Sequence, residues 1–92
     1  MATVRFTPNL EKHVACPPTE VEGGPLVEVL DAVFRTNERA RGYVLDEHGA
    51  VRHHVVIFVD GTMIRDRTGL TDVVPENGEV YVMQALSGGS DA

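Results

Sequence analysis

The pattern of apolar and polar residues divides the chain into short strands around one helical stretch. In residues 2–7, Val4 and Phe6 alternate with polar residues, which is the period of a strand that buries one face. A second short strand is predicted at residues 19–22, where β-favouring residues resume after a proline-containing irregular stretch. We expect these two strands to form a hairpin with a long loop.

The apolar period changes after Gly23-Gly24-Pro25. One helical stripe follows, formed by Leu26, Val29, Leu30, Val33 and Phe34. Proline suits the first position of a helix, where its missing N–H is not needed. We therefore predict a helix over residues 25–39, with Gly42 as its stop.

The longest β signal runs from Val51 to Val59, and its second half has no polar interruption. Such a run is typical of a central strand with both faces at least partly covered. Asp60-Gly61 predicts a tight turn after it, and residues 62–64 a short edge strand. Residues 70–74 are interpreted as a single helical turn. Residues 75–78 predict the turn that leads into the last strand.

The last predicted strand, residues 79–86, has two different faces. Val80 and Val82 alternate with Tyr81 and Met83. If the valines face the helix, Tyr81 and Met83 face outward, and Phe58 on the neighbouring strand can join them. An exposed apolar patch on a small sheet usually marks a partner site, and a small cluster under a loop or a self-association surface also fits this pattern. We expect these three residues, together with Leu86, to form a docking surface.

The order of elements predicts an α+β fold. One helix covers only one face of a sheet, so a mixed four- to five-stranded sheet with one main helix across one face, the β-grasp architecture, fits the pattern. Other small α+β sheets fit the pattern as well. We expect one domain over residues 1–86, followed by a flexible tail, residues 87–92, that contains Gly88-Gly89.

Composition and charge narrow the class of protein. The chain has 92 residues, of which 42% are hydrophobic and 24% charged, and its net charge is −6. An acidic balance argues against nucleic-acid binding, which needs clustered basic residues, and is compatible with docking onto a basic protein surface. No apolar run approaches a membrane span and no signal peptide is evident, so we expect no membrane association and a cytoplasmic location.

Few residues suggest chemistry within the fold. Cys16 is the single cysteine, which excludes a thiolate cluster, and no feature indicates a reactive thiol. His53 and His54 are placed on the long strand, where adjacent side chains face opposite sides and cannot chelate one metal together. Since no phosphate loop or catalytic triad signature is present, we expect no bound metal, no bound cofactor and no enzyme activity.

The chain resembles the MoaD/ThiS family of ubiquitin-like β-grasp sulfur carrier proteins. The resemblance covers residues 2–89 and rests on the order of elements together with three short motifs. These are Val59-Asp60-Gly61 after the long strand, Asn77-Gly78-Glu79-Val80 before the last strand, and the ending Leu86-Ser87-Gly88-Gly89.

The resemblance implies a function for the tail. In such carriers an enzyme related to ubiquitin-activating enzymes, an adenylyltransferase and sulfurtransferase, uses ATP to adenylate the terminal glycine, and the adenylate becomes a thiocarboxylate. A downstream biosynthetic enzyme accepts the sulfur for a cofactor, an amino acid or another metabolite. By position Gly89 would carry the acyl group, while Gly88 and Ser87 would thread into the partner. Glycine suits this position because it lets the backbone approach closely.

The sequence departs from that pattern after Gly89. Ser90-Asp91-Ala92 follows, so Gly89 has an amide in place of a free carboxylate. Some family members are precursors that a zinc-dependent JAMM-type peptidase trims. We therefore expect cleavage at the junction of Gly89 and Ser90.

Two other functions remain open. The chain can be a ubiquitin-like modifier that is joined through Gly89 to lysines of other proteins. It can also be a β-grasp interaction subunit without terminal chemistry, in which case residues 87–92 are dispensable.

Overall fold

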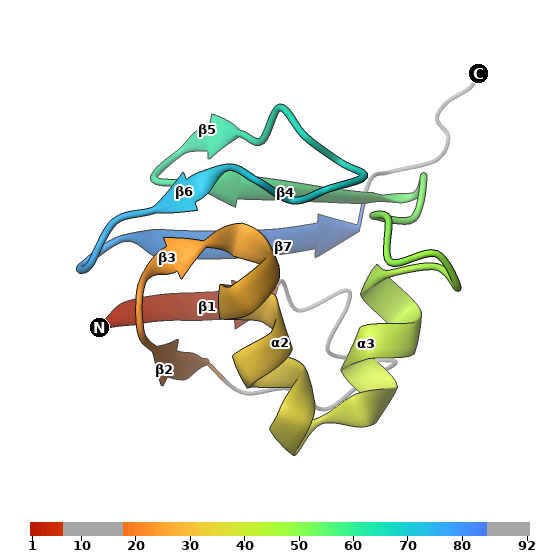
Figure 1. Cartoon of the computed structure of the whole chain (residues 1–92), viewed down its shortest axis with the longest axis horizontal. Helices are drawn as coiled ribbons and strands as arrows, with labels where there is room; N and C mark the ends of the chain where they lie inside the picture. The colour runs from red at the N-terminus through yellow and green to blue at the C-terminus, as the bar shows by residue number, and fades with distance from the viewer. Residues whose placement is uncertain (7–17, 85–92) are drawn as a thin grey trace.

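The computed structural model describes residues 1–6 and 18–84. Its main sheet has five strands in the order β2-β1-β7-β4-β5. Their bounds are β1 Ala2–Phe6, β2 Thr19–Val21, β4 Val55–Val59, β5 Thr62–Met63 and β7 Glu79–Gln84. Helices α2 (Leu26–Thr36) and α3 (Glu38–Val44) lie on one side of this sheet (Figure 1). This is the predicted β-grasp architecture, with a second helix added.

β7 is the central strand of the sheet. It pairs in parallel with β1, where Val4 lies opposite Val80. On its other side it pairs antiparallel with β4, where Ile57 lies opposite Val82. β1 in turn forms the predicted hairpin with β2. Two rows of backbone hydrogen bonds therefore hold the strand that leads into the tail.

The core lies between the helices and one face of the sheet. Val80 and Val82 are fully buried there, which confirms the prediction that they face the helix. The largest other side chains with almost no exposure are Leu26, Leu30, Ile57, Leu70, Val4, Val29, Val33, Val44, Val55 and Val74. The predicted helical stripe is confirmed as well, since each of its five members is buried. The opposite face of the sheet carries no helix within the described residues (Figure 1).

The predicted bounds of the helix, residues 25–39, are wrong. α2 ends at Thr36, because Asn37 leaves the helical region with φ −148° and ψ 83°. The Asn37 side chain accepts a hydrogen bond from the Ala40 N–H at 3.2 Å and caps a new helix, α3. Gly42 lies inside α3 and is not a stop. α3 buries Ala40 and Val44.

The predicted helical turn at residues 70–74 is also wrong. Val73–Val74 form strand β6, which pairs with β3 (Gly24–Pro25) in a second, two-stranded sheet. Pro25 is accordingly the N-cap of α2 and not its first helical residue. Gly23 lies so close to this segment that an added Cβ would approach Val74 O and Pro75 O to 2.8 Å. Residues 23–25 and 73–75 are far apart in the sequence, so their contact arises only when the chain folds.

The strand predicted over residues 51–59 is shorter than expected. β4 begins at Val55, and Val51 instead forms an isolated bridge with Leu45. A turn separates the two, closed by the Val55 N–H, which donates to Arg52 O at 2.9 Å. Arg67 Nη2 donates to the Arg52 and Val55 carbonyl oxygens, both at 2.7 Å. The predicted turn at Asp60-Gly61 and the edge strand after it are confirmed.

Candidate functional site

The predicted tail site lies outside the described residues. Leu86, Ser87, Gly88, Gly89 and Ser90 all follow Gln84, the last residue of β7. The structure does show how the chain that leads to them is anchored. Gln84 is the Cα partner of Val55 on β4, at the end of β7 that is nearest to the tail in the sequence.

Phe58, Tyr81 and Met83 come together on the open face of the sheet, as predicted. Phe58 is the Cα partner of Tyr81 on one side and of Met63 on the other, so these side chains share a face. Met83 follows Tyr81 by two positions and points the same way. Tyr81 is 42% exposed and Met63 is 51% exposed, while Phe58 and Met83 are half-buried. We call Phe58, Met63, Tyr81 and Met83 the open-face patch.

A small hollow opens at one side of this patch. It is lined by Phe58, Gly61, Glu79, Tyr81 and Met83, and its volume is about 190 Å³. Sites for small organic ligands usually measure about 300–1,000 Å³. The hollow therefore has room for one protein side chain and is too small for a typical cofactor.

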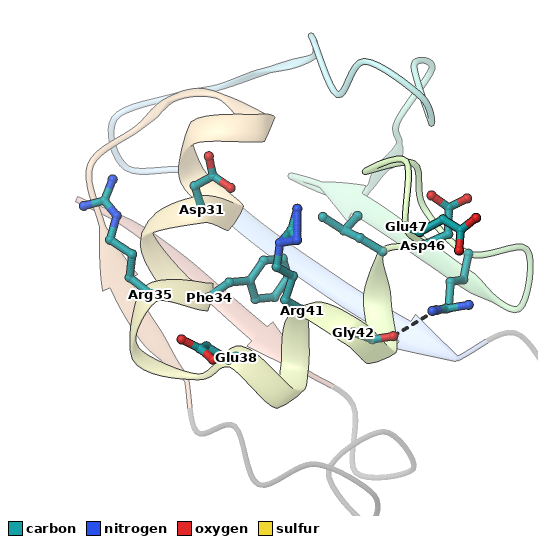
Figure 2. A pocket seen from close by; sticks show the side chains of 10 residues that line it. Asp31, Phe34, Arg35, Glu38, Arg41, Gly42, Asp46 and Glu47 are labelled. Carbon is teal, nitrogen blue, oxygen red and sulfur yellow. Dashed lines mark hydrogen bonds between the residues drawn. The ribbon is translucent and has the colours of Figure 1, made fainter.

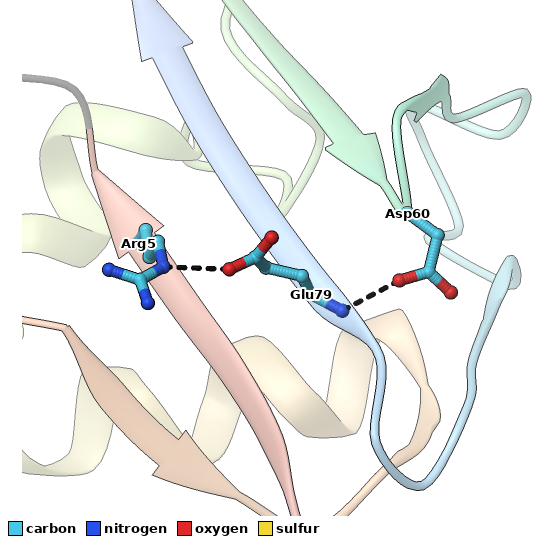
Figure 3. A network of polar contacts seen from close by, with 3 residues as sticks. All are labelled: Arg5, Asp60 and Glu79. Atoms are coloured by element: carbon cyan, nitrogen blue, oxygen red, sulfur yellow. Dashed lines mark hydrogen bonds and ion pairs between the residues drawn. The ribbon is translucent and has the colours of Figure 1, made fainter.

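A polar group borders the hollow. Arg5 Nε donates to Glu79 Oε2 at 2.8 Å, and both side chains are about half exposed (Figure 3). The Glu79 N–H donates to Asp60 Oδ1 at 2.8 Å, which fixes the start of β7 against the turn at Asp60 (Figure 3). An exposed ion pair of this kind stabilises a fold by under about 1 kcal/mol. Its main effect is to orient the Glu79 carboxylate beside the patch.

Sequence reasoning missed Met63 and Arg5 as members of this surface. Met63 belongs to a strand of two residues, and only its pairing with Phe58 shows which face it occupies. Arg5 lies opposite Tyr81 because β1 and β7 are parallel neighbours, a pairing that joins distant parts of the chain. From the sequence alone, Glu79 belongs with Asp60, Asp66, Asp72 and Glu76 to an acidic set that we expect to form a solvated rim. Its period-two spacing to Tyr81 places it on the open face.

Two other members of that predicted acidic rim organise a loop. Asp66 accepts hydrogen bonds from Thr71 Oγ at 2.6 Å and from the Gly69 N–H at 2.8 Å. These bonds, the one from Thr71 above all, hold the pKa of Asp66 well below its usual range. The Asp72 carboxylate accepts from the Arg65 and Asp66 N–H groups, which also lowers its pKa. Beyond the solvated rim expected from the sequence, these two carboxylates hold the backbone of the loop in place.

The histidines lie in a turn and not on the long strand. His53 and His54 precede β4, and the His54 ring meets Tyr43 edge to face with centroids 5.8 Å apart. Within residues 1–6 and 18–84, no group of three His, Cys, Asp or Glu side chains is placed to hold a metal ion. Cys16 and His13 lie outside the described residues.

A larger groove, of about 600 Å³, lies on the helical side (Figure 2). Its lining combines three arginines with four carboxylates, namely Arg35, Arg41 and Arg52 with Asp31, Glu38, Asp46 and Glu47. Arg52 Nε donates to Gly42 O at 2.9 Å, and the Asp46 carboxylate accepts from the N–H groups of its own turn. This balance of charge favours neither an anion nor a cation. We assign the groove no ligand.

Among the helices that the structure describes, none combines the length and apolar character required to cross a bilayer.

The fold is shared with several solved structures. SAMP1 from Haloferax volcanii matches with a TM-score of 0.75 at 18% identity, over 96% of this chain and 98% of that chain. Small archaeal modifier protein 1 from Methanosarcina acetivorans matches with a TM-score of 0.77 at 18% identity, over 96% of this chain and 95% of that chain. A chain of the BexX/CysO complex from Amycolatopsis orientalis matches with a TM-score of 0.74 at 22% identity, over 97% of this chain and 100% of that chain.

These matches establish the ubiquitin-like β-grasp fold and confirm, at the level of the fold, the resemblance to MoaD/ThiS-type proteins. No protein-family model matches the sequence, and a comparison with curated proteins gives no match.

Proposed function

We propose that this protein is a ubiquitin-like sulfur carrier whose Gly89 carries the sulfur. A peptidase first hydrolyses the Gly89–Ser90 peptide bond, in which water adds across the amide and frees the Gly89 carboxylate. An activating enzyme then transfers AMP from ATP to that carboxylate and releases pyrophosphate. A sulfur donor displaces AMP from the acyl carbon, and the end of the chain becomes a thiocarboxylate.

One observation supports this proposal above the others. β7 combines two features in a single strand: Tyr81 and Met83 of the open-face patch, and a direct lead into Ser87-Gly88-Gly89. A partner that docks on the patch is therefore held close, along the chain, to the residues that it must activate. The shared fold with SAMP1 and with a chain of the BexX/CysO complex is consistent with this role.

The chemistry needs activation by a partner. A free C-terminal carboxylate has a pKa of about 3.5, so it is ionised at neutral pH and is a poor electrophile. Adenylation creates a mixed anhydride with a good leaving group. The ATP belongs to the activating enzyme in this proposal, the zinc belongs to a JAMM-type peptidase, and the sulfur passes to a downstream biosynthetic enzyme.

The decisive experiment is an intact mass measurement on protein isolated from its native cell. We expect a chain that ends at Gly89, with one terminal oxygen replaced by sulfur. A matched sample in which Gly89 is changed to Val should lack the sulfur, because a branched side chain crowds the acyl carbon. A full-length and unmodified chain, taken while sulfur transfer is active, would contradict the proposal.

A second candidate function is protein modification. The Methanosarcina acetivorans protein, which shares this fold, is named a small archaeal modifier protein, and this shared fold supports protein modification as a second candidate. In this case Gly89 forms an isopeptide bond with a lysine of another protein and AMP leaves. Peptide mass spectrometry of cell extracts would find that bond. If deletion of residues 87–92 leaves the cellular activity intact, both proposals are contradicted. The function as an interaction subunit without terminal chemistry would then be supported.

A further inference from the structure

The hollow beside Tyr81 combines apolar walls with one carboxylate. Phe58, Tyr81 and Met83 supply the apolar walls, and Glu79 reaches the same space from the start of β7. A purely apolar partner group would cover the Glu79 carboxylate and leave Arg5, which engages only Oε2, as its partner, and burial of an incompletely paired carboxylate is costly. The lining therefore favours a group that is apolar along its length and positively charged at its end.

We propose that the hollow receives an arginine side chain from the activating enzyme, paired with Glu79. The aliphatic part of arginine would contact Met83 and Phe58, and its planar guanidinium suits both the Tyr81 ring and a carboxylate. This inference rests on the proposed function for the identity of the partner, and it adds the residue type by which that partner is recognised.

The size of the hollow supports a single side chain. Its volume of about 190 Å³ lies below the range for small-molecule sites, as noted above. The charge supports a cation. The whole chain carries −6, and Asp60 lies beside the lining residue Gly61, so Glu79 and Asp60 together outweigh Arg5 at this border. Complementary charge across an interface selects the partner and its register.

The structure presents Glu79 in a way that leaves it available. Arg5 engages Oε2, and in the described part of the chain no hydrogen bond to Oε1 is present. The backbone of Glu79 is fixed to Asp60 by a 2.8 Å hydrogen bond. An incoming guanidinium can therefore bind Oε1 while Arg5 stays in place. Arg5 reduces the attraction, because it already neutralises part of the charge of Glu79.

This arrangement predicts opposite effects for two substitutions. Glu79→Gln removes the charge that attracts the guanidinium, and we expect the affinity of the protein for an arginine side chain to fall about threefold. Arg5→Ala removes the competing cation, and we expect binding to strengthen by about the same factor. Glu20→Gln is the matched control, since Glu20 is exposed on β2 and does not line the hollow. Loss of folding cannot imitate this pattern, because one variant gains affinity.

The test is an NMR titration of the full chain with N-acetyl-arginine methylamide at millimolar concentration. The matched probe is the citrulline analogue, which has nearly the same shape and no charge. We expect the arginine probe to shift the amide signals of Phe58, Gly61, Glu79 and Tyr81 more strongly than the citrulline probe. We expect this difference between the shifts caused by the two probes to disappear in the Glu79→Gln variant and to persist in the Glu20→Gln variant.

Three results would overturn the proposal. These are equal shifts with both probes, shifts that map elsewhere, and shifts of the same residues on concentrating the protein alone, which would identify a second copy as the occupant. The titration contains no activating enzyme, so its outcome does not depend on whether Gly89 is adenylated. If the titration is positive and Gly89 is unmodified in the cell, the arginine site in the hollow is supported and the sulfur-carrier function is contradicted.

Discussion

Asp60 and Glu79 are joined by two reciprocal hydrogen bonds. The Asp60 N–H donates to Glu79 O at 2.8 Å. The Glu79 N–H donates to Asp60 Oδ1, also at 2.8 Å (Figure 3). Asp60 has a φ of 51° and Gly61 a φ of 84°, as a tight hairpin turn requires. This pair connects the turn after β4 to the start of β7, and so fixes one end of the open-face patch.

Asp60→Ala should therefore destabilise the fold, while Asp60→Asn should not. Alanine loses the side-chain acceptor and is disfavoured at a positive φ, and we expect a loss of about 1–2 kcal/mol in the free energy of unfolding. Asparagine keeps an oxygen acceptor and tolerates this conformation. Urea unfolding of the two variants measures the difference. Equal losses in both would show that the charge of Asp60, and not its hydrogen bond, is what matters.

Gly23→Ala and Gly42→Ala should have opposite effects on stability. At Gly23 the new Cβ would approach two backbone oxygens, Val74 O and Pro75 O, to 2.8 Å, and we expect a loss of about 1–3 kcal/mol. At Gly42, inside α3, a Cβ meets nothing within 4 Å, and we expect a gain of about 0.5–1 kcal/mol. Thermal unfolding of both variants tests this, and a destabilised Gly42→Ala would contradict the helical assignment.

Met83→Asp and Val82→Asp should separate docking from folding. Val82 is fully buried, so an aspartate there places an unpaired charge in the core and should unfold the protein. Met83 is half-buried on the open face, and its aspartate variant should keep the wild-type circular dichroism spectrum. Its affinity for the activating enzyme should fall by at least about tenfold. If Met83→Asp unfolds as well, Met83 belongs to the core.

Thr71→Val should raise the pKa of Asp66. The hydrogen bond from Thr71 Oγ is the largest cause of the lowered pKa, and valine cannot donate one. A lowered pKa in the folded state means that the carboxylate stabilises the fold above its unfolded pKa of 3.8, and that this contribution is lost as the pH falls further. NMR titration of the Asp66 side-chain carbon measures the shift. An unchanged pKa would assign the effect to the backbone donors.

The parts of the fold that follow from local periodicity are predicted well by the sequence. The buried stripe of α2 and the two faces of β7 need only the spacing of apolar residues. The break at Asn37 is harder to predict, because it depends on the Asn37 side chain, which caps a second helix by accepting from the Ala40 N–H. The sequence alone therefore predicts one helix that continues past Asn37.

The parts that depend on distant pairing could not be predicted. β3 and β6 have two residues each, too few for any period, and form because the folded chain brings Pro25 opposite Val73. The same holds for the open-face patch. Phe58, Tyr81 and Met83 follow from alternation along two strands, whereas Met63 and Arg5 join them only through the order of strands in the sheet.

The parallel pairing of β1 and β7 also determines how the molecule resists mechanical force. If Ala2 and Gln84 are pulled in opposite directions, the hydrogen bonds between the two strands are loaded together in shear. A hairpin pulled at its open end would instead lose them one at a time. Since β4 holds the other side of β7, tension applied at Gln84 spreads into the middle of the sheet. An enzyme that draws on the end of this chain would meet a rigid anchor.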